Sequence, residues 1–366
     1  MSASNEVGVS PDRNVVFDHV TLGQRVLFRS GGAVECAVEA LADLDAERIL
    51  LIADRFAIDV ADEIARRVTV VGRIHDIVQH VPGPNARDAV ALAEQSGADV
   101  VLSIGGGSST GLAKIVARDT GLPIVAIPTT FAGSEATNVW GLTEGERKTT
   151  GADDRVLPRI VIYDAGLMAT MPASLAMSSA LNAVAHAIDG FWAPRADPIN
   201  RALGTEGLRA LFSGVRLLHE NPESLEARER TLYGAYLAGV AFASAGSGLH
   251  HKICHALGGT FNLPHAETHS VVIGYVVAFN APFATDAAER VVSAMGGVGS
   301  AGGALYALRK EIGSPASLAE LGFREEDIPR AARAILPSVP STNPRPVTKD
   351  DLEMLLHAAW AGDPIA

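Results

Sequence analysis

The chain has 366 residues, of which 48% are hydrophobic and 20% charged, with a formal net charge of −12 and a pI of about 5.4. This composition is that of a folded globular protein, and the length favours two domains over a single core. The acidic balance disfavours nucleic acid as the main partner, because phosphate contacts need a basic surface, but it leaves room for a local pocket that binds a small anion.

Strands alternate with helices through the first half of the chain, and most of the strands are almost entirely apolar. This alternation predicts a parallel α/β sheet covered on both faces. The expected strands are 14–20, 25–32 (both near a sheet edge), 46–54, 69–78, 98–109 (running into glycines), 122–130 and 158–164; the expected helices are 56–67, 85–97 (after an Asn cap) and 108–121.

Helical periodicity replaces the strands after about residue 172, most clearly in residues 171–192, 202–220 and 223–245. We therefore predict two domains, a nucleotide-binding α/β domain over residues 1–170 and an all-α domain over residues 171–366.

Cysteine is rare, and the two cysteines, Cys36 and Cys254, have no CxxC spacing, which indicates a reducing compartment. The first 14 residues lack the apolar stretch of a signal peptide, and no apolar run reaches membrane-spanning length. We expect a cytosolic protein without a membrane partner.

A glycine-rich turn joins the strand at 98–109 to the following helix. Glycine lets backbone amides approach a phosphate, and a helix N-terminus adds partial positive charge, so the turn predicts a phosphate site; the alternative is a tight turn that needs positive φ. The residues concerned are Gly105, Gly106, Gly107, Ser108 and Ser109.

Two further segments are candidates for cofactor binding. Asp54 ends a buried strand, where its carboxylate either accepts hydrogen bonds from a ribose, which favours NADH over NADPH, or caps the next helix. Residues 128–137 follow another strand and either line the nucleotide or form an ordinary turn; the small and hydroxyl-bearing residues there are Thr129, Thr130, Gly133, Ser134 and Thr137.

Five stretches together resemble the iron-containing alcohol dehydrogenase superfamily and, within it, its maleylacetate reductase branch. They are GGGSS (105–109), PTTFAGSEAT (128–137), ALNAVAHAIDG (180–190), HHKICHALGGTFNLPHAETH (250–269) and NPRPVTKDDL (343–352). The resemblance implies the dehydroquinate synthase-like fold of this superfamily, a cleft between the two domains, reduction with NADH or NADPH, and a homodimer.

The metal ligands of this superfamily are only partly present. Metal-dependent members hold iron or zinc with one Asp and three His, and the matching residues are Asn182, His186, His251 and His265. An Asn carbonyl is a weaker partner for either metal than a carboxylate, and a cleft of imidazoles without that negative charge suits a dianionic substrate. We expect these side chains to bind substrate and no metal; a three-His metal site and a purely structural role are the alternatives.

The resemblance implies reduction of the conjugated C=C bond of maleylacetate to give 3-oxoadipate, a step in the breakdown of aromatic compounds. Negative charge would develop on the ketone oxygen, where a preorganised donor contributes most. Candidates for that donor, and for the proton, are His251, His255 and His265. Lys148 is a second cationic candidate, or an ordinary exposed lysine.

Other functions remain open on the same fold: a metal-dependent dehydrogenase of a small alcohol, a non-redox enzyme, and an NAD-binding protein without catalysis.

We expect Cys254, His250 and His269 to be packing or surface residues more than catalytic ones. Gly274 and Tyr275 replace a Pro-His pair common in the superfamily, which would change substrate preference if that pair shapes the pocket. Arg29, at the entry to the first helix, either binds an anion or points to solvent.

Overall fold

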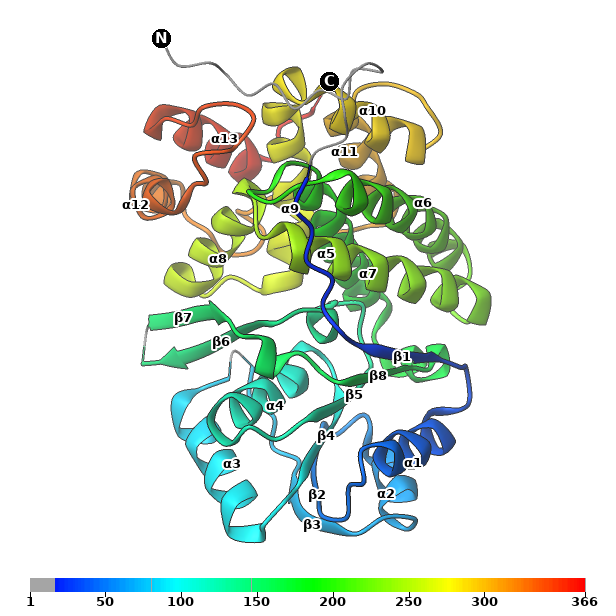
Figure 1. Ribbon diagram of the computed structural model, residues 1–366. Helices are drawn as coiled ribbons and strands as arrows, with labels where there is room; N and C mark the ends of the chain where they lie inside the picture. Colours follow the sequence, from blue (N-terminus) through cyan, green and yellow to red (C-terminus); the bar gives the residue numbers. More distant parts are fainter. Residues whose placement is uncertain (1–16, 80, 146, 366) are drawn as a thin grey trace.

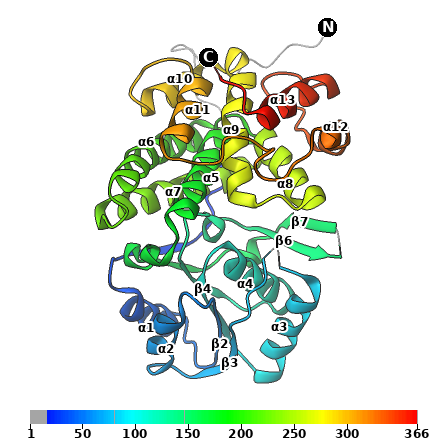
Figure 2. The same cartoon turned by 180° about the vertical axis from the view of Figure 1, so that it is seen from behind.

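The computed structural model describes residues 17–79, 81–145 and 147–365; the side chains of Arg147 and Lys148 are outside this description. The chain forms two stacked parts, a sheet with its helices and a set of packed helices, seen from opposite sides in Figures 1 and 2. The α/β class of the first half and the helical class of the second are confirmed.

A six-stranded parallel sheet in the order β1-β8-β5-β4-β2-β3 forms the centre of the first part. Alternate residues of β2 pack on opposite faces: Ile49 and Leu51 share a core with α1 and α2, and Leu50 and Ile52 share one with α3 and α4. Both faces are therefore covered, which is why the strands are apolar throughout. The strands are β1 (Arg25–Phe28), β2 (Ile49–Ala53), β3 (Val70–Ile74), β4 (Val100–Gly105), β5 (Ile124–Pro128) and β8 (Ile160–Tyr163); the helices are α1 (Ala33–Asp43), α2 (Ile58–Ala65), α3 (Gly83–Ser96) and α4 (Gly107–Thr120).

Two local predictions differ from the structure. Residues 17–20 form no strand, and the rest of the strand expected at 14–20 lies outside the described residues. Helix α3 begins at Gly83 with Pro82 as its N-cap, not after Asn85, because Pro84 already has the fixed φ of a first helical turn.

An antiparallel hairpin was not expected from the sequence. Its strands are β6 (Val139–Glu144) and β7 (Arg147–Ala152), paired from Val139 opposite Ala152 to Glu144 opposite Arg147. The hairpin lies between the sheet and helix α8 (Leu249–Phe261; Figure 1) and so forms part of the junction between the two halves of the molecule.

The helical part begins after a 3₁₀ segment at Ala165–Thr170, which is where the predicted division at residues 170 and 171 falls. Within the described residues no single helix is long and apolar enough to cross a membrane; α7 and α8 pass that test only as a pair, and they are bent by 97° at their junction. The helices are α5 (Ala173–Trp192), α6 (Pro198–Glu220), α7 (Leu225–Ala245), α8 (Leu249–Phe261), α9 (His265–Asn280), α10 (Thr285–Ala294), α11 (Ala301–Glu311), α12 (Ile328–Ile335) and α13 (Lys349–Ala361).

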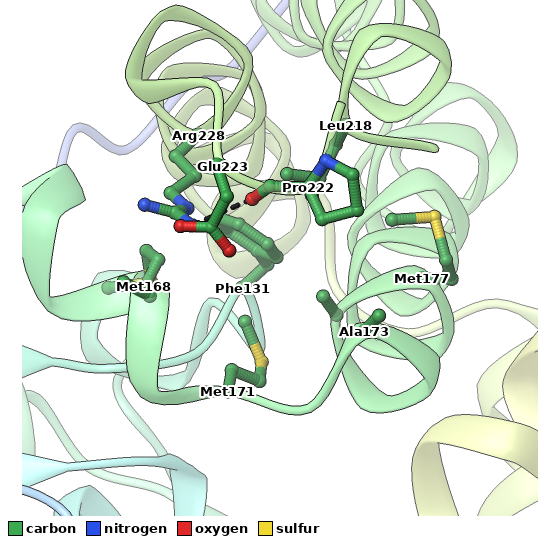
Figure 3. Close-up of a pocket in the computed structure, with 11 residues that line it drawn as sticks. Phe131, Met168, Met171, Ala173, Met177, Leu218, Pro222, Glu223 and Arg228 are labelled. Carbon is green, nitrogen blue, oxygen red and sulfur yellow. Dashed lines mark hydrogen bonds and ion pairs between the residues drawn. The ribbon is translucent and has the colours of Figure 1, made fainter. Parts of the chain in front are cut away.

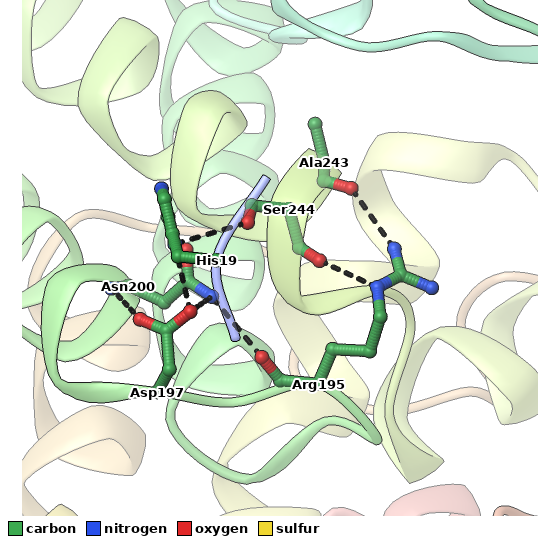
Figure 4. A network of polar contacts seen from close by, with 6 residues as sticks. All are labelled: His19, Arg195, Asp197, Asn200, Ala243 and Ser244. Atoms are coloured by element: carbon green, nitrogen blue, oxygen red, sulfur yellow. Dashed lines mark hydrogen bonds and ion pairs between the residues drawn. The ribbon is translucent and has the colours of Figure 1, made fainter. Parts of the chain in front are cut away.

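The segment before β1 ties the two parts together. His19 Nδ1 lies 2.7 Å from the buried Asp197 carboxylate and 3.4 Å from Ser244 Oγ, both in the helical part (Figure 4). Five residues later, Gln24 donates to the carbonyls of Glu135 and Pro158 in the sheet part. The chain is therefore anchored on both sides of the junction before the first strand begins.

Glycine allows α6 and α7 to pack closely. A Cβ on Gly234 would lie 2.8 Å from the Gly207 carbonyl oxygen and 2.9 Å from the Leu211 amide nitrogen, both backbone atoms that cannot move independently. We expect Gly234→Ala to lower the free energy of unfolding by about 1–3 kcal/mol, since overpacking outweighs the gain of about 1 kcal/mol in helix propensity. Urea denaturation measures this, with Gly23→Ala as the control because nothing lies within 4 Å of that position. Equal stability of the two variants would contradict the packing argument.

Candidate active site

The glycine loop follows β4, which lies next to β2 in the sheet. From β2 the chain continues to β3 on one side, and from β4 it continues to β5 on the other side, so the two connections diverge at this point. Parallel sheets commonly bind ligands at the carboxyl ends of such strands. Gly105 has φ of 149°, and a Cβ there would lie 2.3 Å from Ser109 Oγ and 2.4 Å from Asp54 Oδ2. Gly106 is the N-cap of α4 with no side-chain cap, so the first turn of this helix keeps amides for an anion.

Asp54 is held by backbone amides. Its Oδ1 accepts from Phe56 and Ala57 at 3.0 and 3.1 Å, and its Oδ2 accepts from Gly106 at 3.3 Å. The carboxylate thus closes the turn before α2 and braces the glycine loop. It is not the N-cap of α2, which is Ala57 without a side-chain cap, so the predicted capping role is wrong in detail. Asp54 is not among the residues that line the cleft described below, and ribose binding there stays a prediction.

Lys114 holds the loop after β5 in place through hydrogen bonds. Its ammonium is buried and donates to the carbonyls of Ser134, Thr137 and Val139 at 2.7, 2.7 and 2.8 Å, and to Thr137 Oγ1 at 3.0 Å. Burial lowers the pKa of Lys114 to about 7, an effect that the nearby Glu135 carboxyl opposes. Since three carbonyls need three N–H donors, the loop geometry requires the protonated amine.

One cleft of about 400 Å³ connects the sheet part to the helical part. Of the predicted cofactor residues, Gly107, Ser108, Thr130, Ser134 and Thr137 line it, and Gly105, Gly106, Ser109 and Thr129 do not. At its other end all five predicted substrate and catalytic residues of the helices line it: Asn182, His186, His251, His255 and His265.

The cleft histidines come from three helices that present one face each. Asn182 and His186 are one helical turn apart on α5, and His251 and His255 are one turn apart on α8. His265 is the first residue of α9. Three buried atoms have no hydrogen-bond partner: Asn182 Oδ1, His186 Nδ1 and His251 Nε2. The helices therefore place unsatisfied polar atoms at this end of the cleft.

Asp189 orients His251, although the sequence did not single it out. Its Oδ2 accepts from His251 Nδ1 at 2.7 Å and from the amides of Gly248 and His251, and its Oδ1 accepts from Trp192 Nε1. Burial lowers the pKa of His251 well below its usual value, and His186 and His255 add repulsion. The ring is therefore neutral near pH 7, with its proton on Nδ1 and Nε2 left bare.

Burial also lowers the pKa of His186 to about 4. Its ring stacks on His251 with centroids 4.8 Å apart, and Phe242 covers both rings. A bound anion would raise the pKa of these imidazoles, because a nearby negative charge favours the protonated form. The arrangement can therefore take up a proton together with an anionic ligand.

Iron or zinc does not fit the residues at the superfamily's metal position. Asn182 supplies a neutral oxygen in place of a carboxylate, and the rings of His186 and His251 are stacked nearly parallel, with centroids 4.8 Å apart. Within the described part of the chain, three His, Cys, Asp or Glu donor atoms come within 4.8 Å of one another only at His250, Cys254 and His269, outside the residues that line the cleft.

Several other predicted residues lie away from the cleft. His250 and His269 are fully buried, so the surface alternative is wrong for both, and burial raises the pKa of the Cys254 thiol well above its usual value, which opposes a reactive thiolate. Gly274 packs against the Gly302 carbonyl, and Tyr275 donates to the Asp363 carbonyl. Neither lines the cleft, so the exchange of Pro-His for Gly-Tyr does not change its wall directly.

Arg29 is solvent-exposed and does not line the cleft either, which agrees with the second of its two predicted roles. Lys148 belongs to β7 by its backbone, but its side chain lies outside the described residues. A catalytic role for Lys148 therefore stays a prediction.

A second, smaller hollow of about 110 Å³ lies behind the loop after β5 (Figure 3). Phe131 points into it together with Met168, Met171 and Met177, and Arg228 closes it by donating to the Pro222 carbonyl at 2.7 Å. The flanking residues Thr130 and Ala132 line the main cleft, so this loop separates the two hollows.

The comparison with known proteins agrees with this geometry. Residues 23–165 match the iron-containing alcohol dehydrogenase family, and residues 176–360 match the C-terminal region of the Fe-containing alcohol dehydrogenase family. The chain belongs to the iron-containing alcohol dehydrogenase family. It is therefore an oxidoreductase, and the predicted family and fold are confirmed.

Relatives in this family have similar length as well as similar sequence. Maleylacetate reductase 1 of Cupriavidus pinatubonensis is 42% identical over 93% of this chain and 96% of its own. The crystal structure of an iron-containing alcohol dehydrogenase from Corynebacterium glutamicum superposes with a TM-score of 0.92 at 47% identity, covering 96% of this chain and 98% of that one. Maleylacetate reductase from Rhizobium sp. strain MTP-10005 superposes with a TM-score of 0.90 at 38% identity, covering 96% and 99%.

Two residues of the site escaped prediction, Asp189 and Lys114. Both had a signal in the sequence, because each is a charged residue inside a mostly apolar stretch of a helix, in AHAIDGFW and in GLAKIVA. A charge in such a position is buried only when it has partners. The partners are distant in sequence, so only the fold reveals them.

Replacing Lys114 should destabilise the loop that it supports. Lys114→Met would leave one buried and two partly buried carbonyls without donors. At about 1–3 kcal/mol for a buried group and less for the others, we expect a loss on the order of 3 kcal/mol in the free energy of unfolding. Urea denaturation measures the loss, with the exposed Lys310→Met as the matched control, expected within about 0.5 kcal/mol of the wild type. A Lys114→Met variant as stable as its control would rule out this role.

Proposed function

We propose that the protein reduces the conjugated C=C bond of maleylacetate to give 3-oxoadipate, with NADH as the reductant and without a catalytic metal. The observation that carries the proposal is the single cleft that joins the glycine loop to Asn182 and the histidines of α5, α8 and α9. Relatives named maleylacetate reductase, alike over nearly their whole length, support the choice of substrate.

The cofactor end of the cleft suits a dinucleotide. The amides at the start of α4 favour a diphosphate, and Thr130, Ser134 and Thr137 offer hydroxyls along the path towards the histidines. When bound, NADH supplies the hydride. The role of the chain is to orient the nicotinamide against the substrate and to exclude water, with Lys114 holding the loop that does so.

The histidine end of the cleft suits a dicarboxylate. His186 Nδ1 on one wall and His251 Nε2 on another have no partner, and once protonated they can donate to a carboxylate and a ketone oxygen. The equally unpartnered Asn182 Oδ1 is an acceptor and can pair only with a donor such as a protonated imidazole. The neutral imidazoles of His186 and His251 become better donors once an anion raises their pKa. Charge that develops on the ketone oxygen is then stabilised in place, and a lining histidine, His251, His255 or His265, returns a proton to carbon.

Two accompanying expectations are part of the same proposal. The enzyme would prefer NADH to NADPH, because the Asp54 carboxylate beside the glycine loop repels a 2′-phosphate. Homodimer assembly and a role in the breakdown of aromatic compounds are further predictions from the resemblance.

Oxidation of NADH, followed at 340 nm with freshly made maleylacetate, tests the proposal. We expect turnover that is unchanged by EDTA and by prior removal of metals, since Asn182 does not provide the carboxylate of the family's metal site. Activity lost with EDTA and restored by iron or zinc would assign a metal to the cleft and contradict the proposal. Turnover of small alcohols in place of maleylacetate would identify the metal-dependent dehydrogenase instead.

Asp189→Asn tests how His251 is oriented. An amide can present a donor to His251 Nδ1 and so reverse the tautomer, which costs from about 10-fold for an orienting partner to about 10⁴-fold where the histidine is the essential base. We expect kcat with maleylacetate to fall at least about tenfold, and ¹⁵N NMR of the imidazoles to show the proton moved to Nε2.

Asp197→Asn is the matched control for this experiment. Asp197 is also buried and also accepts from a histidine, His19, but it lies outside the cleft. The control should keep the wild-type kcat. An equal effect of the two substitutions would mean that Asp189 acts only through stability.

A further inference from the structure

Helix α8 presents a second pair of metal-binding side chains on the face away from the cleft. His250 and Cys254 are one turn apart there and meet His269 of the neighbouring helix α9. His250 Nε2 lies 2.9 Å from His269 Nδ1 and 3.6 Å from Cys254 Sγ, and the three donor atoms lie within 4.8 Å of one another. All three side chains are at most 1% exposed.

The three donors have nearly the spacing of a trigonal metal site. Bonds of about 2.0 Å to imidazole nitrogen and about 2.3 Å to thiolate sulfur would place the two nitrogens about 3.5 Å apart and each about 3.7 Å from the sulfur. The nitrogens therefore need to separate by about half an ångström, and the His250 Nε2–Cys254 Sγ distance of 3.6 Å is already close. The His269 nitrogen and the sulfur lie within 4.8 Å of each other, so closing the triangle takes rotation of the His269 ring and of the Cys254 side chain.

The net charge of the occupied site favours a monovalent cation. The cluster packs among apolar side chains such as Leu257, Val272 and Val276, where an uncompensated charge is costly. The nearby Asp189 carboxylate acts on His250 and Cys254, but it is already paired with His251 and with backbone amides. A thiolate with a monovalent cation is neutral, whereas a thiolate with Zn²⁺ leaves one positive charge. Soft sulfur and imidazole ligands, a coordination number of three and a charge of +1 are together met by Cu⁺.

We propose that His250, Cys254 and His269 form a binding site for a soft monovalent cation, Cu⁺, separate from the catalytic cleft. On binding, Cys254 releases one proton and its sulfur bonds to the ion. Before the ion binds, one proton lies between His250 Nε2 and His269 Nδ1. On binding it moves to the other nitrogen of the ring that held it, so that His250 carries its proton on Nδ1 and His269 carries its proton on Nε2. Both of these nitrogens are buried and have no partner that would resist this change of tautomer.

The site is coupled to the cleft through its rings. The His269 ring centroid lies 4.4 Å from that of His265 and 4.9 Å from that of His251, and both of these line the cleft. Fixing His269 on an ion therefore constrains two candidate catalytic histidines. The binding itself does not depend on which substrate the cleft takes.

Anaerobic titration of the full-length protein with Cu⁺ held by bicinchoninate tests the site. We expect the wild type to withdraw one Cu⁺ per chain from the competitor over hours, since a fully buried site opens slowly, and its melting temperature to rise. X-ray absorption of the loaded protein should show one sulfur at about 2.3 Å and two nitrogens at about 2.0 Å.

Variants decide whether this cluster holds the ion. Cys254→Ser should lower the Cu⁺ affinity at least tenfold, and the matched control Cys36→Ser, which removes the other buried cysteine, should leave it unchanged. If Cys254→Ser fails to fold, as judged by circular dichroism, His250→Asn replaces it with the same expectation. Wild type that takes no Cu⁺, binding that survives the loss of Cys254 or His250, or a spectrum with nitrogen ligands only would overturn the proposal.

Discussion

The contact on which the site depends most is the buried carboxylate of Asp189. It accepts four hydrogen bonds, from Trp192 Nε1, the amides of Gly248 and His251, and His251 Nδ1. It therefore joins α5 to the start of α8 and sets the direction of a cleft histidine at the same time. The junction leaves no room for a larger residue, because a Cβ on Gly248 would lie 2.5 Å from Asp189 Oδ1.

The buried ammonium of Lys114 has a similar positioning role on the cofactor side. The Lys114 ammonium donates to three carbonyls of the loop after β5, while Asp54 accepts from the Gly106 amide of the glycine loop and from two amides of the turn before α2. Each group is satisfied by backbone atoms, which is how a charge is tolerated in a covered position. Asp189 thus fixes the histidine side of the cleft, and Lys114 and Asp54 fix the cofactor side, without needing to touch a ligand.

Loss of one acidic residue changes the chemistry that the cleft favours. The family's metal position has Asn182 in place of Asp, and burial keeps the pKa of His186 and His251 below the usual value. A pocket of neutral imidazoles lacks the negative charge that holds a divalent metal, and it gains protons when an anion enters. The proposed binding of a dicarboxylate in place of a metal rests on this difference.

The sequence alone determined the parallel sheet, the helical second half, the family and the residues of the histidine cluster. These follow from local patterns: apolar runs of strand length, helical periodicity, glycines after a strand, and histidines four residues apart. It did not reveal the hairpin β6–β7, whose residues alternate only weakly, or the cap of α3, where Pro84 overrides Asn85.

The histidines predicted from the sequence do face the cleft, but only the tertiary structure decided what the other side chains of the same helices contact. Adjacent residues of one helix point in different directions, so His251 and His255 line the cleft while His250 and Cys254 turn towards α9. It also paired Asp189 with His251 and Lys114 with its loop, partners that lie 20 or more residues apart along the chain. Such contacts depend on how helices pack against one another, and no local pattern in the sequence records that.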